Sequence, residues 1–247
     1  MATSSPVSVK VHVFSDFDGT LCYDDTGVLL IDDPRSLGSE KRKQLDKAIL
    51  NGQLTYRDGV KSMWDSVTMT MEEAWTDHLD KARVDRGFPE FHKYCQNNDI
   101  PITVVSSGLY PLLERMMIKF LGENDAKDIK IISNDVHIDG RNWNVQWHDD
   151  SPYGNDKSKA LQQARENSSS DTIFIFCGDG ISDISAAKHA DVLFARKGRD
   201  LEIHCHRESI PFIPFDSFDD ILVVLNSLVT GKVRLERDPS TGFCRIE

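Results

Sequence analysis

The stretch Val11–Thr20, VHVFSDFDGT, joins an apolar run to two acidic residues and a glycine. Val and Phe are enriched in β-strands, so residues 9–15 are predicted to form a strand. Asp16 and Asp18 follow this strand two positions apart, and in a strand that continues both side chains point to the same face. Buried carboxylates are costly unless something pairs or coordinates them. The stretch therefore predicts either a solvated turn or a cation-binding site at a strand end.

Further along the chain, apolar runs typical of strands alternate with helical patterns. Strands are predicted at residues 102–107, 129–138, 172–178 and 191–195, and helices at residues 89–98, 109–122, 157–167, 182–190 and 216–229. The Asp139-Gly140 step predicts a β-hairpin. Strands that alternate with helices pair in parallel through right-handed crossovers and are covered on both faces. The pattern therefore predicts an α/β fold with a three-layer α/β/α arrangement around a parallel sheet.

Residues 24–86 interrupt this alternation with a charged, helical segment that contains Met and Trp. Ser39 and Thr70 are predicted N-caps, and Gly52 and Gly87 are predicted helix ends. We interpret the segment as a small helical insertion after the first strand. The predicted domains are a core of residues 1–23 and 87–235, a helical insertion of residues 24–86, and a C-terminal tail of residues 236–247.

Composition limits the partners that the chain can bind. Among 247 residues, 29 Lys and Arg oppose 40 Asp and Glu, for a net charge of −11, which disfavours nucleic acid or a membrane surface as a partner. The 5 cysteines form no CxxC pair and suit a reducing compartment. No apolar run is long enough to span a membrane, and the N-terminus resembles no secretory signal. We expect a cytoplasmic monomer or homodimer.

Residues that can carry chemistry follow the predicted strands. In a parallel sheet the ligand crevice lies beyond the carboxyl ends of the strands. Asp16 and Asp18 follow the first strand, Ser106–Gly108 end another, Gly178–Asp183 follow a third, and Lys157 begins a helix. These residues are therefore predicted to meet at one edge of the sheet.

Four carboxylates at one edge, Asp16, Asp18, Asp179 and Asp183, would repel one another unless a cation neutralised them. An all-oxygen ligand set suits Mg²⁺, which also leaves positions for water and phosphate oxygens. This combination is typical of phosphoryl transfer, in which positioning and charge neutralisation dominate. The predicted cofactor is therefore Mg²⁺, and the predicted substrate is a small phosphate ester.

The two acids after the first strand receive different predicted roles. Asp16 would attack phosphorus and form an aspartyl-phosphate, while Asp18 would protonate the leaving group and then activate water. The Ser106 hydroxyl, the amide groups near Ser107 and Gly108, and Lys157 would hold the phosphoryl oxygens. The predicted phosphate-binding residues are Ser106, Ser107, Gly108 and Lys157.

Simpler interpretations exist for each motif taken alone. The sequences DFDG and GDG are common in solvated turns, Ser106 can simply end a strand, and Lys159 is an alternative to Lys157. The occurrence of all motifs in order favours a site. A group in the insertion either lines a substrate pocket or forms the core of the insertion: Tyr23, Asp25, Tyr56, Arg57 and Trp64.

The motifs resemble those of a known family. DFDGT, the strand ending in Ser106, Lys157 and GDGISD resemble, in order, the four motifs of the haloacid dehalogenase superfamily of phosphatases. The resemblance covers residues 9–194, is strongest to the phosphoserine-phosphatase-like branch, and implies a Rossmann-like core with a small helical cap at residues 24–86. The blocks VVSSG, SPYGNDKS and FCGDGISDISAAK resemble fungal members that act on polyol and sugar-alcohol phosphates.

The resemblance also implies roles for individual residues. It makes Asp16 the nucleophile and Asp18 the general acid/base, and it implies that the Mg²⁺ ligands are Asp16, the backbone carbonyl of Asp18, and Asp179, with Asp183 in support. Phosphoserine phosphatases carry a cap glutamate nine residues after the nucleophile, where this chain has Asp25, a predicted substrate-binding residue. They also carry a cap arginine that has no counterpart in residues 59–64.

The sequence thus predicts a Mg²⁺-dependent phosphatase for small phosphate monoesters, with polyol or sugar phosphates favoured. Two alternatives remain. One is a phosphatase for phosphoserine or another amino-acid or amino-alcohol phosphate, and the other is a phosphate-binding regulatory module without activity. The presence of Asp18 argues against the second, because binding a phosphate group does not require an acid two residues after Asp16.

Overall fold

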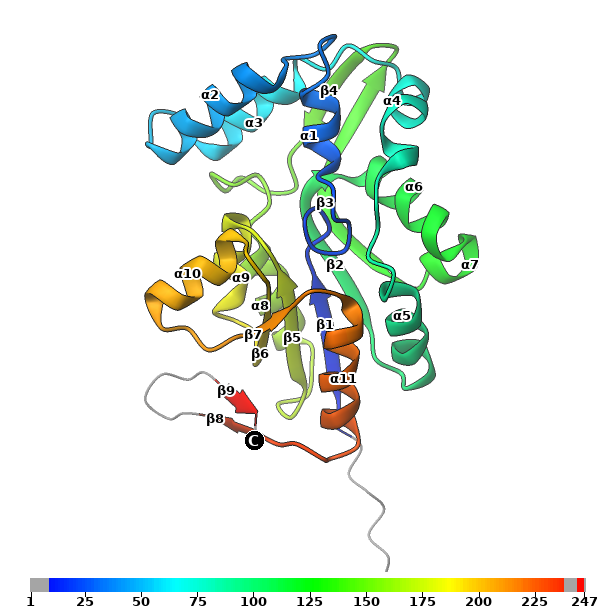
Figure 1. Ribbon diagram of the computed structural model, residues 1–247, viewed down its shortest axis with the longest axis vertical. Coiled ribbons are helices and arrows are strands. Elements are labelled where there is room, and N and C mark those ends of the chain that lie inside the picture. The colour runs from blue at the N-terminus through cyan, green and yellow to red at the C-terminus, as the bar shows by residue number, and fades with distance from the viewer. Residues whose placement is uncertain (1–8, 238–243, 247) are drawn as a thin grey trace, which may run out of the picture. The chain divides into compact units, whose positions relative to one another are not determined.

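The computed structural model describes residues 9–237 and 244–246 (Figure 1). Its strands form a seven-stranded sheet in the order β4-β3-β2-β1-β5-β6-β7. The strands are β1 (Val11–Ser15), β2 (Ile102–Leu109), β3 (Lys130–Asp139), β4 (Asn142–Gln146), β5 (Ile173–Gly178), β6 (Val192–Arg196) and β7 (Ile213–Phe215). The chain divides into two compact units: unit 1 comprises Met1–Ser15, Arg86–Thr103 and Ser158–Glu247, and unit 2 comprises Asp16–Asp85 and Val104–Lys157.

Unit 1 contains the parallel part of the sheet, in which β1 pairs with β5, β5 with β6, and β6 with β7. Its helices are α5 (Phe88–Asn97), α8 (Lys157–Glu166), α9 (Ile184–Ala187), α10 (Asp200–Glu208) and α11 (Phe218–Val229), with a 3-10 turn, η2, at Ile181–Asp183. The first residue of α8, Lys157, belongs to unit 2. The predicted α/β class with a mainly parallel sheet is confirmed.

The core of unit 1 lies on both faces of β5, because successive strand residues point to opposite faces. On one face the ring of Phe174 packs against Arg165 of α8, whose guanidinium lies 3.7 Å from the ring centroid. On the other face Cys177 lies near Cys95 of α5, and burial raises the pKa of the Cys177 thiol. Helices therefore cover both faces, as the apolar run TIFIF predicts.

Unit 2 contains the continuation of β2 after Thr103 and the antiparallel hairpin of β3 and β4 at the predicted Asp139-Gly140 turn. Its helices are α1 (Thr26–Ile31), α2 (Ser39–Leu50), α3 (Tyr56–Trp64), α4 (Met71–Asp77), α6 (Tyr110–Leu121) and α7 (Glu123–Ala126), with a 3-10 turn, η1, at Leu79–Lys81. Trp64 is 3% exposed and stacks on Trp143 of β4 with ring centroids 5.9 Å apart. Helices α1–α4, on either side of the hairpin in Figure 1, all lie within residues 24–86.

Local predictions succeeded where capping and turn signals were strong. Thr70 is the N-cap of α4 and forms a capping box with Glu73. Ser39 is not an N-cap: it is the first residue of α2, and Gly38 precedes it without a side-chain cap. The helix predicted at 182–190 is shorter, since only Ile184–Ala187 is α-helical. The sequence analysis missed α10 and β7.

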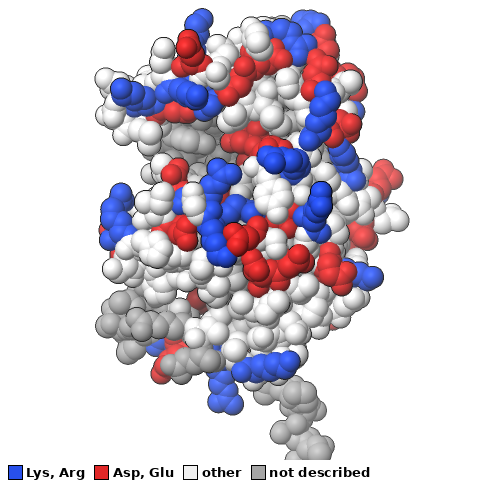
Figure 2. Space-filling model, viewed as in Figure 1, with Lys and Arg blue, Asp and Glu red and all other residues white. Residues whose placement is uncertain are grey.

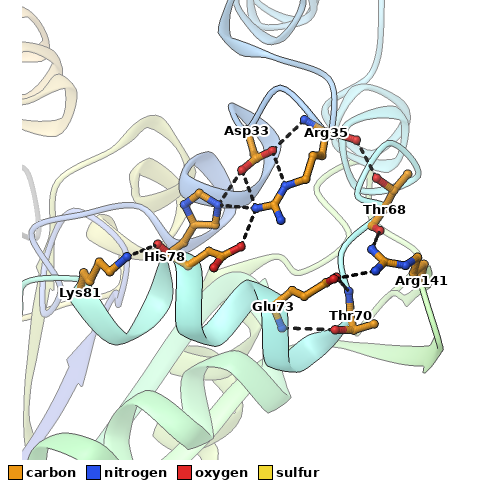
Figure 3. A network of polar contacts seen from close by, with 9 residues as sticks. Asp33, Arg35, Thr68, Thr70, Glu73, His78, Lys81 and Arg141 are labelled. Atoms are coloured by element: carbon orange, nitrogen blue, oxygen red, sulfur yellow. Dashed lines mark hydrogen bonds and ion pairs between the residues drawn. The ribbon is translucent and has the colours of Figure 1, made fainter.

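A network of polar contacts joins elements of unit 2 that lie far apart in the sequence (Figure 3). Asp33 accepts hydrogen bonds from Arg35, and its Oδ2 lies 2.8 Å from Nε2 of His78. The Arg35 carbonyl accepts a 2.6 Å hydrogen bond from the Thr68 hydroxyl. Arg141, in the hairpin turn, donates to the Thr68 carbonyl. These contacts connect the segment after α1 to the segments before and after α4 and to the β3–β4 turn.

The C-terminal segment, predicted as a tail of residues 236–247, falls partly outside the described residues, which omit 238–243 and 247. The described part includes β8 (Leu235–Arg237) and β9 (Cys244–Ile246), which pair in an antiparallel ladder. Basic and acidic side chains are interspersed over the visible face (Figure 2). Among the described residues, the helices are all too short or too polar to cross a membrane.

Candidate active site

The residue that follows β1, Asp16, forms a buried ion pair. Its Oδ1 lies 2.8 Å from Nζ of Lys157, and the two side chains are 7% and 1% exposed. The same Oδ1 accepts a 2.7 Å hydrogen bond from the amide of Phe17. Both contacts fix the orientation of the carboxylate. Lys157 also places a cation at the end of β1 in a protein whose net charge is −11.

The tight turn after Asp16 depends on Gly19 and brings Asp18 beside the helical insertion. Gly19 has φ 79°, a conformation that L-residues rarely adopt. Asp18 Oδ1 then accepts a 2.7 Å hydrogen bond from the amide of Thr26, the first residue of α1. The turn therefore connects the end of β1 directly to the start of the insertion.

The environment of Asp18 raises its pKa from 3.8 to about 7. Burial is the largest cause and the nearby charge of Asp25 is the second, while the hydrogen bonds from Thr26 and the charge of Lys157 act in the opposite direction. A carboxyl group that titrates near neutral pH can both donate and accept a proton. This property suits a general acid/base.

The end of β2 approaches Asp18 closely at Gly108. A Cβ atom on Gly108 would lie 3.1 Å from Oδ2 of Asp18 and 3.2 Å from Oγ of Ser106, so a side chain here would crowd both groups. The Gly108 amide donates a 3.0 Å hydrogen bond to Oγ of Ser106. Unit 2 thus brings together the predicted residues Asp16, Asp18, Ser106, Gly108 and Lys157.

Ser107, near the end of β2, has a buried hydroxyl. The Tyr56 hydroxyl of α3 lies close enough to Ser107 for their polar interaction to lower the Tyr56 pKa, but burial dominates and raises that pKa to about 12. The Ser107 carbonyl accepts a 2.9 Å hydrogen bond from Asn134 of β3. Tyr56 of α3 therefore lies beside the end of β2.

A loop from β4 to Lys157 is held in place by Asn155 and Arg57. The Asn155 side chain is buried and donates to the carbonyls of Ser106, at 2.8 Å, and Ile132. The Arg57 guanidinium of α3 lies 5.2 Å from the ring centroid of Trp147. These contacts fix the backbone that presents Lys157 to Asp16.

In unit 1, Asp183 shapes the turn that follows β5. Its Oδ2 accepts hydrogen bonds from the amides of Asp179 and Gly180, each at 2.9 Å. A Cβ atom on Gly178 would lie 2.6 Å from the same oxygen, so only glycine fits there. Asp183 thereby fixes the backbone that carries Asp179.

The strand register relates this turn to Asp16. Ser15 pairs with Cys177, so the chain leaves β1 and β5 at the same level, one residue before Asp16 and two residues before Asp179. Asp16 follows β1, and Asp179 and Asp183 lie in the turn after β5, so each of the three can offer a carboxylate oxygen to a metal ion. Every donor in this set is a carboxylate oxygen, which suits Mg²⁺ better than the softer metals that prefer nitrogen or sulfur.

The sequence left open whether five residues line a substrate pocket or form the core of the insertion. The structure places these residues in different environments. Trp64 belongs to the core, and Tyr56 lies beside Ser107. Asp25 is the N-cap of α1 and accepts a 2.7 Å hydrogen bond from the amide of Val28. Its residue surface is exposed, yet surrounding protein desolvates the carboxyl group and raises its pKa. The Arg57 guanidinium lies over the ring of Trp147, and the Tyr23 amide donates a hydrogen bond to the Arg83 carbonyl.

Sequence analysis missed two buried asparagines, Asn134 and Asn155, that position Ser106 and Ser107. A signal for Asn134 existed, since asparagine is depleted in strands and lies here in the strand-like run IKIISNDVHI. The contact of Tyr56 with Ser107 joins positions 51 residues apart and had no local signal.

Comparison with known proteins gives an independent result. Residues 13–188 match the haloacid dehalogenase-like hydrolase family. The chain is 40% identical over 215 residues to Pdp3-interacting factor 1 of Schizosaccharomyces pombe, covering 86% of this chain and 93% of the relative. It is 34% identical over 232 residues to the polyol phosphate phosphatase PYP1 of Saccharomyces cerevisiae, covering 91% and 96%.

Solved structures support the same fold. A phospho-aspartyl intermediate analogue of phosphoserine phosphatase superposes with a TM-score of 0.65 at 18% identity, covering 87% of this chain and 98% of that one. At that identity the likeness concerns the fold. Together with the phosphatases among the relatives, it bears out the predicted phosphomonoesterase. The chain therefore belongs to the haloacid dehalogenase-like hydrolase family.

Proposed function

We propose that this protein is a Mg²⁺-dependent phosphatase that hydrolyses small phosphate monoesters, preferably polyol or sugar phosphates, through an aspartyl-phosphate on Asp16. The observation that carries the proposal is the contrast between two neighbouring carboxylates. Asp16 is paired with Lys157 at 2.8 Å, whereas Asp18 is desolvated and has a pKa of about 7. Environments that separate two carboxyl groups in this way are typical of a nucleophile beside a general acid/base.

In the proposed first step, an oxygen of Asp16 forms a bond to phosphorus while the bond from phosphorus to the alcohol oxygen breaks. Asp18 gives its proton to that leaving oxygen. In the second step, water gives a proton to Asp18 and attacks phosphorus, which releases inorganic phosphate and restores the Asp16 carboxylate. Asp18 then starts the next cycle in its protonated form.

The phosphoryl oxygens would be held by Lys157 Nζ, the Ser106 hydroxyl, and the amide groups of Ser107 and Gly108. Asp16, the Asp18 carbonyl and Asp179 would hold Mg²⁺, with Asp183 supporting the turn that carries Asp179. When bound, Mg²⁺ would supply positive charge that offsets the phosphoryl oxygens. The all-oxygen donor set supports this choice of metal.

The proposed substrate class draws on a relative that covers nearly the whole chain, which is named a polyol phosphate phosphatase. A phosphatase for phosphoserine or an amino-alcohol phosphate is the second candidate, favoured by the acidic Asp25 at the start of α1. We further propose a cytoplasmic monomer or homodimer that binds neither nucleic acid nor membranes. The five cysteines are all free, which suits a reducing compartment.

A phosphate-release assay tests the proposal. Purified protein would be incubated with Mg²⁺ and a panel containing glycerol 3-phosphate, sorbitol 6-phosphate, phosphoserine and phosphoethanolamine. We expect release from the polyol esters, loss of turnover in excess EDTA, and recovery when Mg²⁺ is restored. Absence of release from every small ester would refute the phosphatase function, and full turnover in a preparation shown to be free of metal would refute the Mg²⁺ requirement.

A further inference from the structure

Two buried asparagines contact the end of β2, where the phosphoryl group is proposed to bind. Asn155, in the loop before α8, is 3% exposed, and its Nδ2 donates to the carbonyls of Ser106, at 2.8 Å, and Ile132, at 3.3 Å. Asn134 of β3 is 1% exposed, and its Nδ2 donates to the carbonyl of Ser107 at 2.9 Å. We call Asn134 and Asn155 the asparagine pair. The pair holds two successive carbonyls near the end of the strand.

Each of these carbonyls belongs to a peptide group whose amide is a proposed phosphate ligand. A peptide bond is planar and trans, so its C=O and the following N–H point in opposite directions from one rigid group. The carbonyl of Ser106 is joined in this way to the amide of Ser107, and the carbonyl of Ser107 to the amide of Gly108. Hydrogen bonds from the asparagine pair to the two carbonyls therefore set the directions of both amides.

The surroundings of Gly108 show where the second of these amides points. The Gly108 amide donates a 3.0 Å hydrogen bond to Oγ of Ser106. A Cβ atom on Gly108 would lie 3.1 Å from Oδ2 of Asp18. Because the Ser106 oxygen accepts from Gly108, the hydroxyl proton of Ser106 is directed away from that amide. The amide that Asn134 orients thus points at a side chain that is proposed to hold the phosphoryl oxygens.

The side chain of Asn134 is itself held in one orientation. The amide of His148 donates a 3.1 Å hydrogen bond to Oδ1 of Asn134, which leaves Nδ2 facing Ser107. In a buried environment such hydrogen bonds are strengthened, and a carbonyl that accepts one polarises its peptide group, so that the attached amide becomes a better donor. Both effects favour an anion in front of the amides of Ser107 and Gly108.

We propose that Asn134 and Asn155 are positioning residues for phosphoryl transfer, which act through the Ser106-Ser107 and Ser107-Gly108 peptide groups without contacting the substrate. The inference rests on the phosphatase function proposed above and adds two residues to its phosphoryl-binding end. Preorganised amides stabilise charge on the transferring phosphoryl group, so loss of either asparagine weakens binding of the transition state. The alcohol part of the substrate takes no part in this effect, so the loss is the same for every ester.

Aspartate variants remove the donor and keep the shape of the side chain. Asn134→Asp retains an oxygen for the His148 amide but presents a second oxygen to the Ser107 carbonyl, and Asn155→Asp replaces the donor to Ser106. In the presence of Mg²⁺, each variant should lower kcat/KM for glycerol 3-phosphate and for sorbitol 6-phosphate by the same factor, about 10- to 100-fold. The inhibition constant of orthovanadate, which adopts the trigonal-bipyramidal geometry of the transferring phosphoryl group, should rise by a similar factor.

The vanadate measurement separates positioning from a merely structural role. A variant that only reduced the amount of folded enzyme would lower kcat and leave both KM and the vanadate inhibition constant unchanged. Asn134→Ala and Asn155→Ala remove the donor without adding a charge, and they replace the aspartate variants if those fold poorly.

Asn167→Ala is the matched control. Nδ2 of Asn167 donates a 2.7 Å hydrogen bond to the carbonyl of Gln163 on α8, the helix that begins with Lys157. The variant removes the same kind of contact, from a side-chain amide to a backbone carbonyl. It should leave kcat/KM and vanadate inhibition within about twofold of the wild type, as is usual for an exposed residue.

Two results would overturn the inference and leave the phosphatase function intact. One is unchanged vanadate inhibition in the folded variants of either asparagine, which would show that this side chain only satisfies buried carbonyls. The other is a loss of kcat/KM that differs more than about tenfold between the two esters, which would place the effect at the alcohol part of the substrate. Failure of the wild type to release phosphate from any ester would instead refute the proposed function together with the inference.

Discussion

Two groups of ionised side chains in unit 2 have similar chemistry but different surroundings. At the candidate site, Lys157 and Asp16 are almost fully buried. In the network of Figure 3, Arg35 is 44% exposed, while the side chain of its partner Asp33 is 9% exposed. Burial raises the pKa of Asp18 at the site, whereas hydrogen bonds from Arg35 lower the pKa of Asp33 in the network. The two acids thus differ in their partners: burial dominates at Asp18 and raises its pKa, whereas hydrogen bonds from a guanidinium dominate at Asp33 and lower its pKa.

Removal of Lys157 should have the largest effect. Lys157→Met leaves the Asp16 carboxylate buried without its cation, so the free energy of unfolding should fall by about 3 kcal/mol. Turnover should fall by at least about 1,000-fold, because the phosphoryl oxygens lose a charged donor. Denaturant unfolding and phosphate release measure the two effects.

Lys159→Met is the control for this comparison, since Lys159 lies on the same helix and its residue surface is exposed. It should retain turnover within about twofold of the wild type, as is usual for an exposed side chain. A Lys157→Met enzyme with turnover within tenfold of the wild type would contradict the role given to Lys157.

Asp18→Asn separates reactivity from stability. Turnover should fall by about 100- to 10,000-fold, because asparagine cannot exchange protons. In the folded protein the pKa of Asp18 lies above its unfolded value, so ionisation of Asp18 opposes folding above pH 7 and not below pH 4. The metal-free variant should therefore unfold at a higher denaturant concentration than the metal-free wild type at pH 8. Equal or lower stability at that pH would show that Asp18 is not strained by burial.

Asp33→Asn should lower stability and leave turnover nearly unchanged, which is the opposite of what we expect for Asp18→Asn. Turnover should stay within about twofold of the wild type, and the free energy of unfolding should fall by about 1 kcal/mol through loss of a charge-assisted pair. The folded pKa of Asp33 lies below the unfolded value, so its stabilisation is present above pH 4 and is lost as the pH falls through the folded pKa.

Unfolding of Asp33→Asn and wild type at pH 7 and pH 3 tests this dependence, since the difference between them should shrink in acid. Asp77→Asn removes the more exposed partner of Arg35 and should cost less. A large loss of turnover in Asp33→Asn would show that the network does more than hold the insertion together.

The two regions also differ in how far the sequence could predict them. The residues proposed for the site follow strand ends, so they can be predicted from the period of the strands and the Asp16-Phe17-Asp18-Gly19 turn. The prediction depends on the topology, because strand ends meet at one edge of a parallel sheet. The parallel sheet, the hairpin at Asp139-Gly140 and the cap of α4 at Thr70 were predicted for similar local reasons.

The network could not be predicted, because its partners are distant in the sequence. Asp33 meets His78 across 45 positions, and nothing near either residue indicates the other. The contact between Tyr56 and Ser107 likewise depends on how the insertion packs. Helix α10 was missed because its sequence, DLEIHCHRE, is short and polar, so its amphipathic pattern is weak.

The central claim is that Asp16 forms the covalent intermediate. The direct measurement uses glycerol 3-phosphate labelled with ³²P, rapid quenching in acid, and mapping of the label after proteolysis. We predict label on the peptide that contains Asp16 and none in Asp16→Asn, which should also lose turnover. Undiminished turnover in Asp16→Asn, or label on a peptide that lacks Asp16, would contradict the account.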